Sequence, residues 1–433
     1  MTKSDRKAFK PHEYASHVVE TGQVVSDRAL MYRWTGTHWS PIDEDVAERE
    51  AYHWLVRREP DWASFENARK AYRAANLFAP QLPSMTRQVV VPAKNGYVHL
   101  EGTDLDLRAA DPALGLTHAL ECEYLPGSPA PVSFMRFLRR VLPDDAVRAR
   151  VQEYVGYTLL ADARYQRAQF WLGEGANGKG VLANIVQALH GRIAAIALDQ
   201  LAGFHLSVLV GASLVYVDEV PRKPIDEQRL KSMIAGERIA VDRKYREPVS
   251  IHVRGKWLVL GNHLPAITDH STGFWRRWDI VPFSVTIPEH ERDPLLAQHI
   301  IDHEMSGVLN WALEGLVRLQ RRGMFDPIMP SAMTVVLHEA KADTNSVVAW
   351  VDDGSIELGT RCDTLKDSVF EHYRHWCTTN AMRQVSSVQF WKRMHEQFRE
   401  LSLARIRVDG VQRRVCNVQL ALSIPPASLP SLR

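Results

Sequence analysis

A glycine-rich loop between an apolar run and a helical pattern constrains this chain more than any other feature. The segment QFWLGEGANGKGVLANIVQAL occupies residues 169–189. Its apolar start ends at Gly173, and after Lys179 apolar residues recur at helical spacing. Glycines let backbone N–H groups curl around an anion without Cβ clashes, and the N-terminus of the following helix favours negative charge. The order strand, loop, helix therefore predicts a phosphate-binding loop in an α/β fold.

One position departs from the usual form of such a loop, in which Ser or Thr follows the lysine. Gly180 stands where a hydroxyl would contact Mg²⁺, so the metal must find that ligand elsewhere or use water. Lys179 would still reach the outer phosphates of a nucleotide. We predict that the whole loop lines the nucleotide site: Gly173, Glu174, Gly175, Ala176, Asn177, Gly178, Lys179, Gly180 and Val181.

Two carboxylates follow a second buried-strand pattern, SLVYVDEV, at residues 213–220. At a strand end, Asp218 can hold Mg²⁺ and Glu219 can orient and activate an attacking water. Acidic residues after a strand are often only solvated surface. The distance from Lys179, however, is typical of phosphate-loop ATPases, which favours the catalytic interpretation.

Two further motifs lie downstream. KWLVLGNHLP places Asn262 after a strand-like run, where it could hydrogen-bond a γ-phosphate or the attacking water, although Asn before His and Pro is also common turn chemistry. FWRRWDIVPF places Arg276 and Arg277 before another strand-like run. Paired arginines there are usually solvated, but in a ring-shaped ATPase one of them can reach a neighbouring subunit's site and stabilise phosphoryl charge.

In this order and spacing, GEGANGKG, LVYVDEV, LVLGNHLP and FWRRWDIVPF resemble the superfamily-3 helicases. More narrowly, they are similar to phage and plasmid replication proteins that pair this motor with a primase. The resemblance runs over residues 131–322, and the segments YRWTGTHW and EYVGYTLL also resemble that family. It implies an AAA+-like core, a ring that is expected to be a hexamer, and ATP and Mg²⁺ bound between subunits.

The resemblance also assigns roles to residues. It makes Lys179 the phosphate-loop lysine, Asp218 the metal ligand, Glu219 the catalytic carboxylate and Asn262 the polar sensor. It makes Arg276 or Arg277 the arginine finger, and we prefer Arg277. It implies 3'-to-5' movement on single-stranded and forked DNA.

The family further implies a hairpin inside the ring that grips single-stranded DNA, between the carboxylates and the sensor. Residues 236–256 hold two β-like runs joined through Arg243, Lys244, Tyr245 and Arg246. Basic side chains there would pair with phosphates, and Tyr245 could stack on a base. An exposed charged turn without DNA contact is the alternative. Lys244 is the first choice for a DNA contact.

The length of 433 residues predicts two to three domains. We expect a small α+β accessory domain at 1–129, the ATPase domain at 130–330, a winged-helix-like domain at 343–422 and a disordered tail at 423–433. Within the third, Tyr373 and Trp376 are expected in the core. A helix over 386–398 is a hypothetical recognition helix, with Lys392 and Arg393 toward phosphates.

Composition excludes several classes of protein. A formal net charge of +2 excludes a uniformly basic nucleic-acid coat, though not a local basic surface. The four cysteines lack zinc-finger spacing, and we expect a cytoplasmic protein without a signal peptide or membrane span. No upstream paired acids support primer synthesis, so a separate primase or host replication proteins are the expected partners.

Two other functions stay open at this point. The chain could be an ATP-gated assembly factor that binds an origin or recruits a helicase without processive unwinding, which the missing hydroxyl at Gly180 favours. It could also be an accessory ATPase of a mobile element or defence system. Asp218, Glu219 and the arginine pair favour the helicase, because turnover needs them and binding alone does not.

Overall fold

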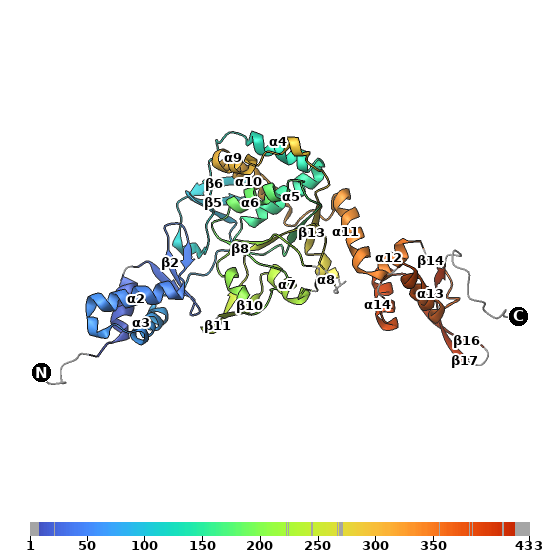
Figure 1. Ribbon diagram of the computed structural model, residues 1–433, viewed down its shortest axis with the longest axis horizontal. Coiled ribbons are helices and arrows are strands. Elements are labelled where there is room, and N and C mark those ends of the chain that lie inside the picture. The colour runs from blue at the N-terminus through green and yellow to red at the C-terminus, as the bar shows by residue number, and fades with distance from the viewer. Residues whose placement is uncertain are drawn as a thin grey trace. The chain divides into compact units, whose positions relative to one another are not determined.

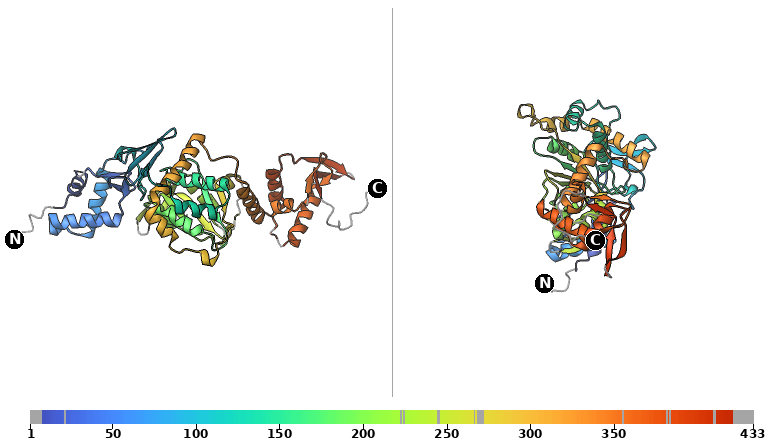
Figure 2. Two further views of the ribbon diagram at one scale, coloured as in Figure 1. Left: turned by 90° about the horizontal axis from the view of Figure 1, so that it is seen from above. Right: turned by 90° about the vertical axis from the view of Figure 1, so that its right-hand side faces the viewer.

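The computed structural model describes residues 8–20, 22–221, 223, 225–243, 246–265, 267, 272–354, 356–380, 382, 384–408 and 411–420 (Figures 1 and 2). The chain forms two compact units. The first comprises Met1–Ala266 and Ser271–Met333, and the second comprises Ile267–His270 and Thr334–Arg433. The finer boundary predicted near residue 130 falls inside the first unit and stays a prediction.

A five-stranded sheet forms the centre of the first unit. Its order is β13-β7-β12-β9-β8, and all neighbouring strands are parallel. The side chains of these strands are mostly buried, as expected for a parallel sheet covered on both faces. The strands are β7 (Ala168–Leu172), β8 (Ile193–Ala195), β9 (Leu214–Val217), β12 (Lys256–Gly261) and β13 (Trp278–Pro282). The predicted α/β class is thereby confirmed.

Helices pack around this sheet and bury its apolar faces (Figure 1). They are α4 (Val132–Val141), α5 (Asp145–Thr158), α6 (Lys179–Ala188), α9 (Leu296–His303) and α10 (Met305–Arg322). A buried ion pair ties α5 to β13, since the Arg150 guanidinium meets both carboxylate oxygens of Asp279 at 2.7 and 2.9 Å. Neither side chain is more than 3% exposed, so the pair fixes α5 against β13, the edge strand that pairs with β7.

The N-terminal part of the first unit mixes helices with two small antiparallel sheets, in line with the α+β expectation. The sheets run β1-β2-β3 and β4-β5-β6, and the turn between β4 and β5 is Lys94-Asn95, one residue earlier than the Asn-Gly pair suggests. The elements are α1 (Pro11–Glu20), β1 (Val24–Ser26), β2 (Met31–Trp34), β3 (Trp39–Pro41), α2 (Glu44–Arg58), α3 (Phe65–Phe78), β4 (Val90–Ala93), β5 (Gly96–Glu101) and β6 (Asp104–Arg108).

A separate antiparallel hairpin lies between the carboxylate and sensor strands in the sequence, where we predicted one. It consists of β10 (Arg238–Arg243) and β11 (Arg246–His252), preceded by α7 (Glu227–Ile234). The short helix α8 (Thr272–Trp275) precedes β13.

The second unit has a core of aromatic side chains that includes Trp350, Tyr373, Trp376 and Phe390, which confirms the core assignment of Tyr373 and Trp376. Its three-stranded antiparallel sheet has the order β15-β17-β16, and β14 pairs with β18. The elements are α11 (Ser331–Thr344, which begins in the first unit), α12 (Ser346–Asp352), β14 (Ile356–Leu358), β15 (Thr364–Leu365), α13 (Lys366–Thr379), α14 (Ser387–Gln397), β16 (Leu403–Val408), β17 (Val411–Cys416) and β18 (Val418–Leu420).

Within the described part of the chain, no helix combines the length and the apolar character that crossing a membrane requires.

Candidate nucleotide-binding site

The glycine-rich loop connects β7 to α6, as its sequence predicts. Gly178 is the N-cap of α6 and has φ +83°, a conformation that side chains with a Cβ rarely adopt. A Cβ at this position would also lie 2.6 Å from Cγ1 of Val141 on α4. Both facts explain why glycine stands before the lysine. The backbone therefore turns at the helix N-terminus, where free N–H groups favour an anion.

Asn177 braces the loop from within. Its side chain is only 4% exposed, and its Nδ2 donates to the carbonyl of Glu174 and, at 3.1 Å, to that of Phe283 after β13. Its Oδ1 accepts from the backbone N–H of Lys179 at 3.3 Å. We predicted Asn177 only as a lining residue, and the sequence carries no signal for this bracing role.

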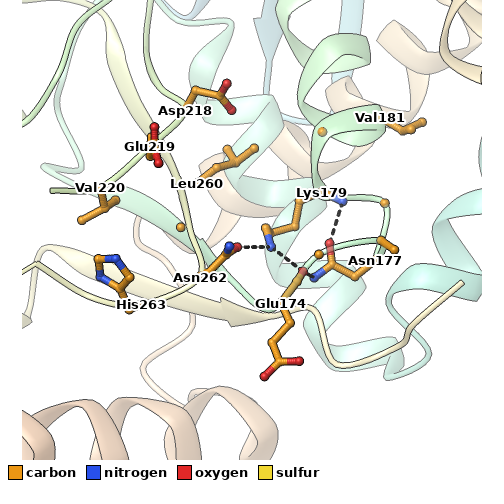
Figure 3. A pocket seen from close by; sticks show the side chains of 15 residues that line it. Glu174, Asn177, Lys179, Val181, Asp218, Glu219, Val220, Leu260, Asn262 and His263 are labelled. Carbon is orange, nitrogen blue, oxygen red and sulfur yellow. Dashed lines mark hydrogen bonds between the residues drawn. The ribbon is translucent and has the colours of Figure 1, made fainter. Parts of the chain in front are cut away.

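Lys179 lies at the centre of the site (Figure 3). Its Nζ donates to the carbonyl of Gly173, to that of Glu174 at 3.0 Å, and to Oδ1 of Asn262 at 3.4 Å. Burial lowers the pKa of the Lys179 ammonium from its ordinary value. The ammonium is thus held over the loop by neutral carbonyl and amide oxygens. The charged oxygens of a phosphate group are stronger acceptors and could replace them.

The two predicted carboxylates follow the end of β9, and both side chains are exposed. The Tyr216 hydroxyl donates to Oδ1 of Asp218 at 2.7 Å. Burial and the Asp218 carboxylate raise the pKa of Tyr216, so this phenol remains a donor at physiological pH. Tyr216 therefore orients Asp218, a positioning role that its place inside a strand pattern did not reveal.

Asn262 follows β12, the strand that lies between β7 and β9 in the sheet. The three strands are parallel, so the phosphate loop, Asn262 and the carboxylates meet at one edge of the sheet. Together they line a cavity of about 420 Å³ (Figure 3). Its lining residues are Glu174, Gly175, Ala176, Asn177, Gly178, Lys179, Gly180, Val181, Asp218, Glu219, Val220, Leu260, Gly261, Asn262 and His263. Of the nine predicted loop residues, Gly173 lies at the start of the loop and outside this lining.

The donor set suits Mg²⁺ bound together with phosphates. This ion takes one or two carboxylates and keeps several waters, and Asp218 offers an exposed carboxylate at the rim. Gly180 adds no ligand, yet a Cβ built there has no atom within 4 Å. Glycine at this position is therefore not required by packing.

Comparisons with known proteins find relatives for part of this chain. A model described as a family of unknown function, DUF5906, matches residues 171–277, which include every lining residue of the cavity. A protein of Acanthamoeba polyphaga mimivirus, named as a presumed helicase (L207/L206), is 25% identical over 165 residues. The match covers 36% of this chain and 17% of the viral protein, so it concerns only a small part of that relative.

The fold has counterparts among solved structures. The A-form apo structure of the NrS-1 C-terminal region has a TM-score of 0.54 and 12% identity, and the match covers 95% of this chain and 100% of that one. A second apo structure of the same region has a TM-score of 0.50, with the same identity and coverage. The family model spans three of the four motifs that resemble superfamily-3 helicases, and the solved structures share the fold of this chain.

The arginine pair expected of this type lies away from the cavity of its own chain. Arg276 and Arg277 precede β13, and the carbonyl of Arg277 accepts from the N–H of Ala168 at the start of β7. The phosphate loop follows the other end of β7, so a full strand length, about 15 Å, separates them. These arginines therefore cannot complete the site that lies on the same sheet.

The two arginines differ in their surroundings. The Arg276 side chain is exposed, whereas Arg277 is partly buried and its Nη1 donates to the carbonyl of Gly273. Burial and the neighbouring Arg276 lower the pKa of Arg277. Exposure thus favours Arg276 over Arg277 as the side chain that reaches outward, opposite to our preference from sequence.

Of the four predicted DNA-binding residues, the structure describes one side chain. Arg243 ends β10, and its Nη1 donates to Oε2 of Glu44, at the start of α2, at 2.9 Å. Both side chains are less than one fifth exposed. Lys244 and Tyr245 lie outside the described residues, as does the side chain of Arg246 at the start of β11.

Proposed function

We propose that this chain is an ATP-dependent DNA helicase, a ring-forming motor that moves along single-stranded DNA during phage or plasmid replication. One observation carries the proposal. The phosphate loop, both carboxylates and Asn262 line a single cavity at the carboxyl edge of a parallel sheet. Binding of a nucleotide needs only the loop, whereas its hydrolysis also needs groups that position metal and water.

Each residue has a distinct role in this proposal. Lys179 would bind the outer phosphates, and Asp218, oriented by Tyr216, would hold Mg²⁺, which neutralises phosphate charge when bound. Glu219 would accept a proton from the attacking water. Asn262, already within reach of Lys179, would hydrogen-bond the γ-phosphate or that water.

The ring is the part of the proposal that explains the arginines. Arg276 and Arg277 lie at the amino ends of the parallel strands, whereas the cavity of their own chain lies at the carboxyl ends. A catalytic role therefore requires the cavity of a neighbouring subunit. An AAA+-like hexamer with sites between subunits meets this requirement.

The β10–β11 hairpin would then contact single-stranded DNA in the ring, and the C-terminal unit would serve as a winged-helix-like module. A separate primase or host replication proteins would be partners.

Steady-state ATP hydrolysis with and without single-stranded DNA tests the proposal, with Lys179→Ala and Glu219→Gln as variants. We expect DNA to stimulate hydrolysis, and each variant to lose it by about 100-fold or more. Glu219→Gln should still bind ATP, because the carboxylate acts on water and not on the nucleotide. Absence of hydrolysis under every condition, with nucleotide binding intact, would contradict a motor.

The second candidate function is an ATP-gated assembly factor that binds an origin or recruits a helicase. The open position at Gly180 is the observation that favours it, since the loop lacks the hydroxyl of the usual metal site. Such a protein would bind DNA only with ATP present and would release no phosphate. The same assay therefore separates the two candidates.

A further inference from the structure

The β16–β17 hairpin of the second unit is rich in arginine. Its described residues, 403–408 and 411–416, include four arginines and no acidic residue. All four side chains are exposed: Arg405, Arg407, Arg413 and Arg414. With the whole chain near neutrality, this hairpin is a strong local concentration of charge.

Strand geometry gathers three of these arginines on one face. Side chains alternate along a strand, so Arg405 and Arg407 point to the same side. Arg414 lies directly opposite Arg405 in the antiparallel register and shares that face. Like charges directly opposite one another are destabilising. Among the described residues, neither Arg405 nor Arg414 has an acidic partner, so the fold itself does not offset this repulsion.

The hairpin also extends away from the helices of its own unit (Figure 1). Its base is anchored, because Val415 and Cys416 are fully buried. Farther along, even apolar side chains are exposed, with Ile406 at 38% and Val411 at 54%. A projecting two-stranded ribbon is one of the two elements that the major groove of B-form DNA admits.

We propose that the β16–β17 hairpin is a binding element for duplex DNA, with Arg405 and Arg414 on backbone phosphates. A guanidinium group pairs with phosphate in a bidentate manner, and a phosphate between the two strands would remove their mutual repulsion. The site lies outside the nucleotide cavity and the β10–β11 hairpin. It does not depend on ATP hydrolysis, so its failure and that of the proposed function are distinguishable.

The hairpin is a better candidate than the helix we singled out from sequence. Arg393 on α14 is partly buried, its Nη1 donates to Oδ1 of Asn345 at 3.0 Å, and burial lowers its pKa. This guanidinium holds the N-cap of α12 and does not face solvent as a phosphate contact would. On that helix, Lys392 remains exposed.

Fluorescence anisotropy of the full-length protein with a labelled duplex, without nucleotide, tests the proposal. The variant is Arg405→Gln with Arg414→Gln, measured across 50 to 200 mM salt. Each lost phosphate contact lowers the slope of log affinity against log salt by about 0.9. The slope of the double variant should therefore be smaller in magnitude by about 1.8. Between 50 and 200 mM salt, the unaltered protein should then lose about ten-fold more affinity than the double variant.

A control with the same change in net charge separates local binding from general electrostatics. Arg361→Gln with Arg374→Gln alters two exposed arginines of the same unit outside the hairpin and should leave the slope unchanged. The thermal midpoint of the hairpin variant should not fall, because a repulsive pair has been removed. Equal slopes in both variants, or a loss confined to single-stranded DNA, would overturn the proposal.

Discussion

At the residue scale, Gly180 offers the most direct test of the metal site. We predict that Gly180→Ser lowers the Mg²⁺ concentration needed for half-maximal ATP hydrolysis several-fold, because the new hydroxyl adds an oxygen ligand. The space around a Cβ at this position is open, so serine fits without displacing a neighbour. A magnesium titration of the hydrolysis rate measures the effect.

Gly180→Ala is the matched control for this prediction. It adds the same Cβ without a hydroxyl, and it raises helix propensity over glycine by roughly 0.5 to 1 kcal/mol, more than serine does. We expect alanine to leave the magnesium requirement unchanged. If serine and alanine behaved alike, the hydroxyl would not reach the metal, and another group would occupy that coordination position.

Two buried histidines should make the first unit sensitive to acid. His190 lies between Ser213 and Thr158 at 3.0 and 3.1 Å, and burial lowers its pKa to about 3. Burial likewise lowers the pKa of His118 well below its ordinary value. Both rings are therefore neutral in the folded protein, whereas in the unfolded chain they titrate at about pH 6.5, the ordinary value for histidine.

The sign of the effect follows from proton binding. Below about pH 6.5 the unfolded chain takes up protons that the folded protein does not, so the free energy of unfolding falls as the pH drops toward 4. The slope approaches about 1.4 kcal/mol per pH unit for each histidine. Urea unfolding at pH 7.5, 6 and 5 measures it. His190→Gln keeps hydrogen-bonding capacity and should reduce the slope by the contribution of one histidine, about 1.4 kcal/mol per pH unit. An unchanged slope would show that His190 is protonated when folded.

At the element scale, the sequence predicted those features that follow from short segments. The glycine-rich loop, the strand before Asp218 and the strand before Asn262 each lie in one continuous pattern, and parallel strands bring their ends together. The bracing by Asn177 and the orientation of Asp218 by Tyr216 were not predictable, because glycine-loop and strand patterns accept many residues at these positions. The pairing of Glu44 with Arg243 joins residues 199 apart in the chain, and no local pattern carries such information.

The pairing of α2 with β10 suggests competition between the N-terminal part and DNA. We predict that Glu44→Gln strengthens binding of single-stranded DNA several-fold at low salt, because Arg243 loses a charged acceptor and a phosphate can take its place. Hydrolysis without DNA should not change. Fluorescence anisotropy with a labelled oligonucleotide measures the affinity.

Glu48→Gln, one turn farther along α2, is the control for the change in net charge. It should have a smaller effect than Glu44→Gln, because no ion pair joins Glu48 to β10 within the described residues. Equal gains in both variants would mean that the N-terminal part repels DNA in general and does not restrain the hairpin.

At the scale of the whole molecule, the proposed ring requires each site to be shared between two subunits. We predict that Arg276→Ala alone loses hydrolysis by about a thousand-fold, as expected for an arginine finger. Mixed with Lys179→Ala subunits, it should regain activity, because an intact cavity on one subunit then faces an intact arginine on the next. In an equal mixture, roughly a quarter of the interfaces of a heterologous ring have this arrangement.

The same logic supplies a control that tests the geometry itself. Lys179→Ala and Glu219→Gln both damage the cavity of their own subunit, so mixing them creates no intact site and should restore nothing. Recovery in the first mixture but not in the second would show that the arginine acts across an interface, as the proposed ring requires. If Arg276→Ala kept full activity, or if neither mixture recovered, the exposed arginine would not be the group that completes the neighbouring site.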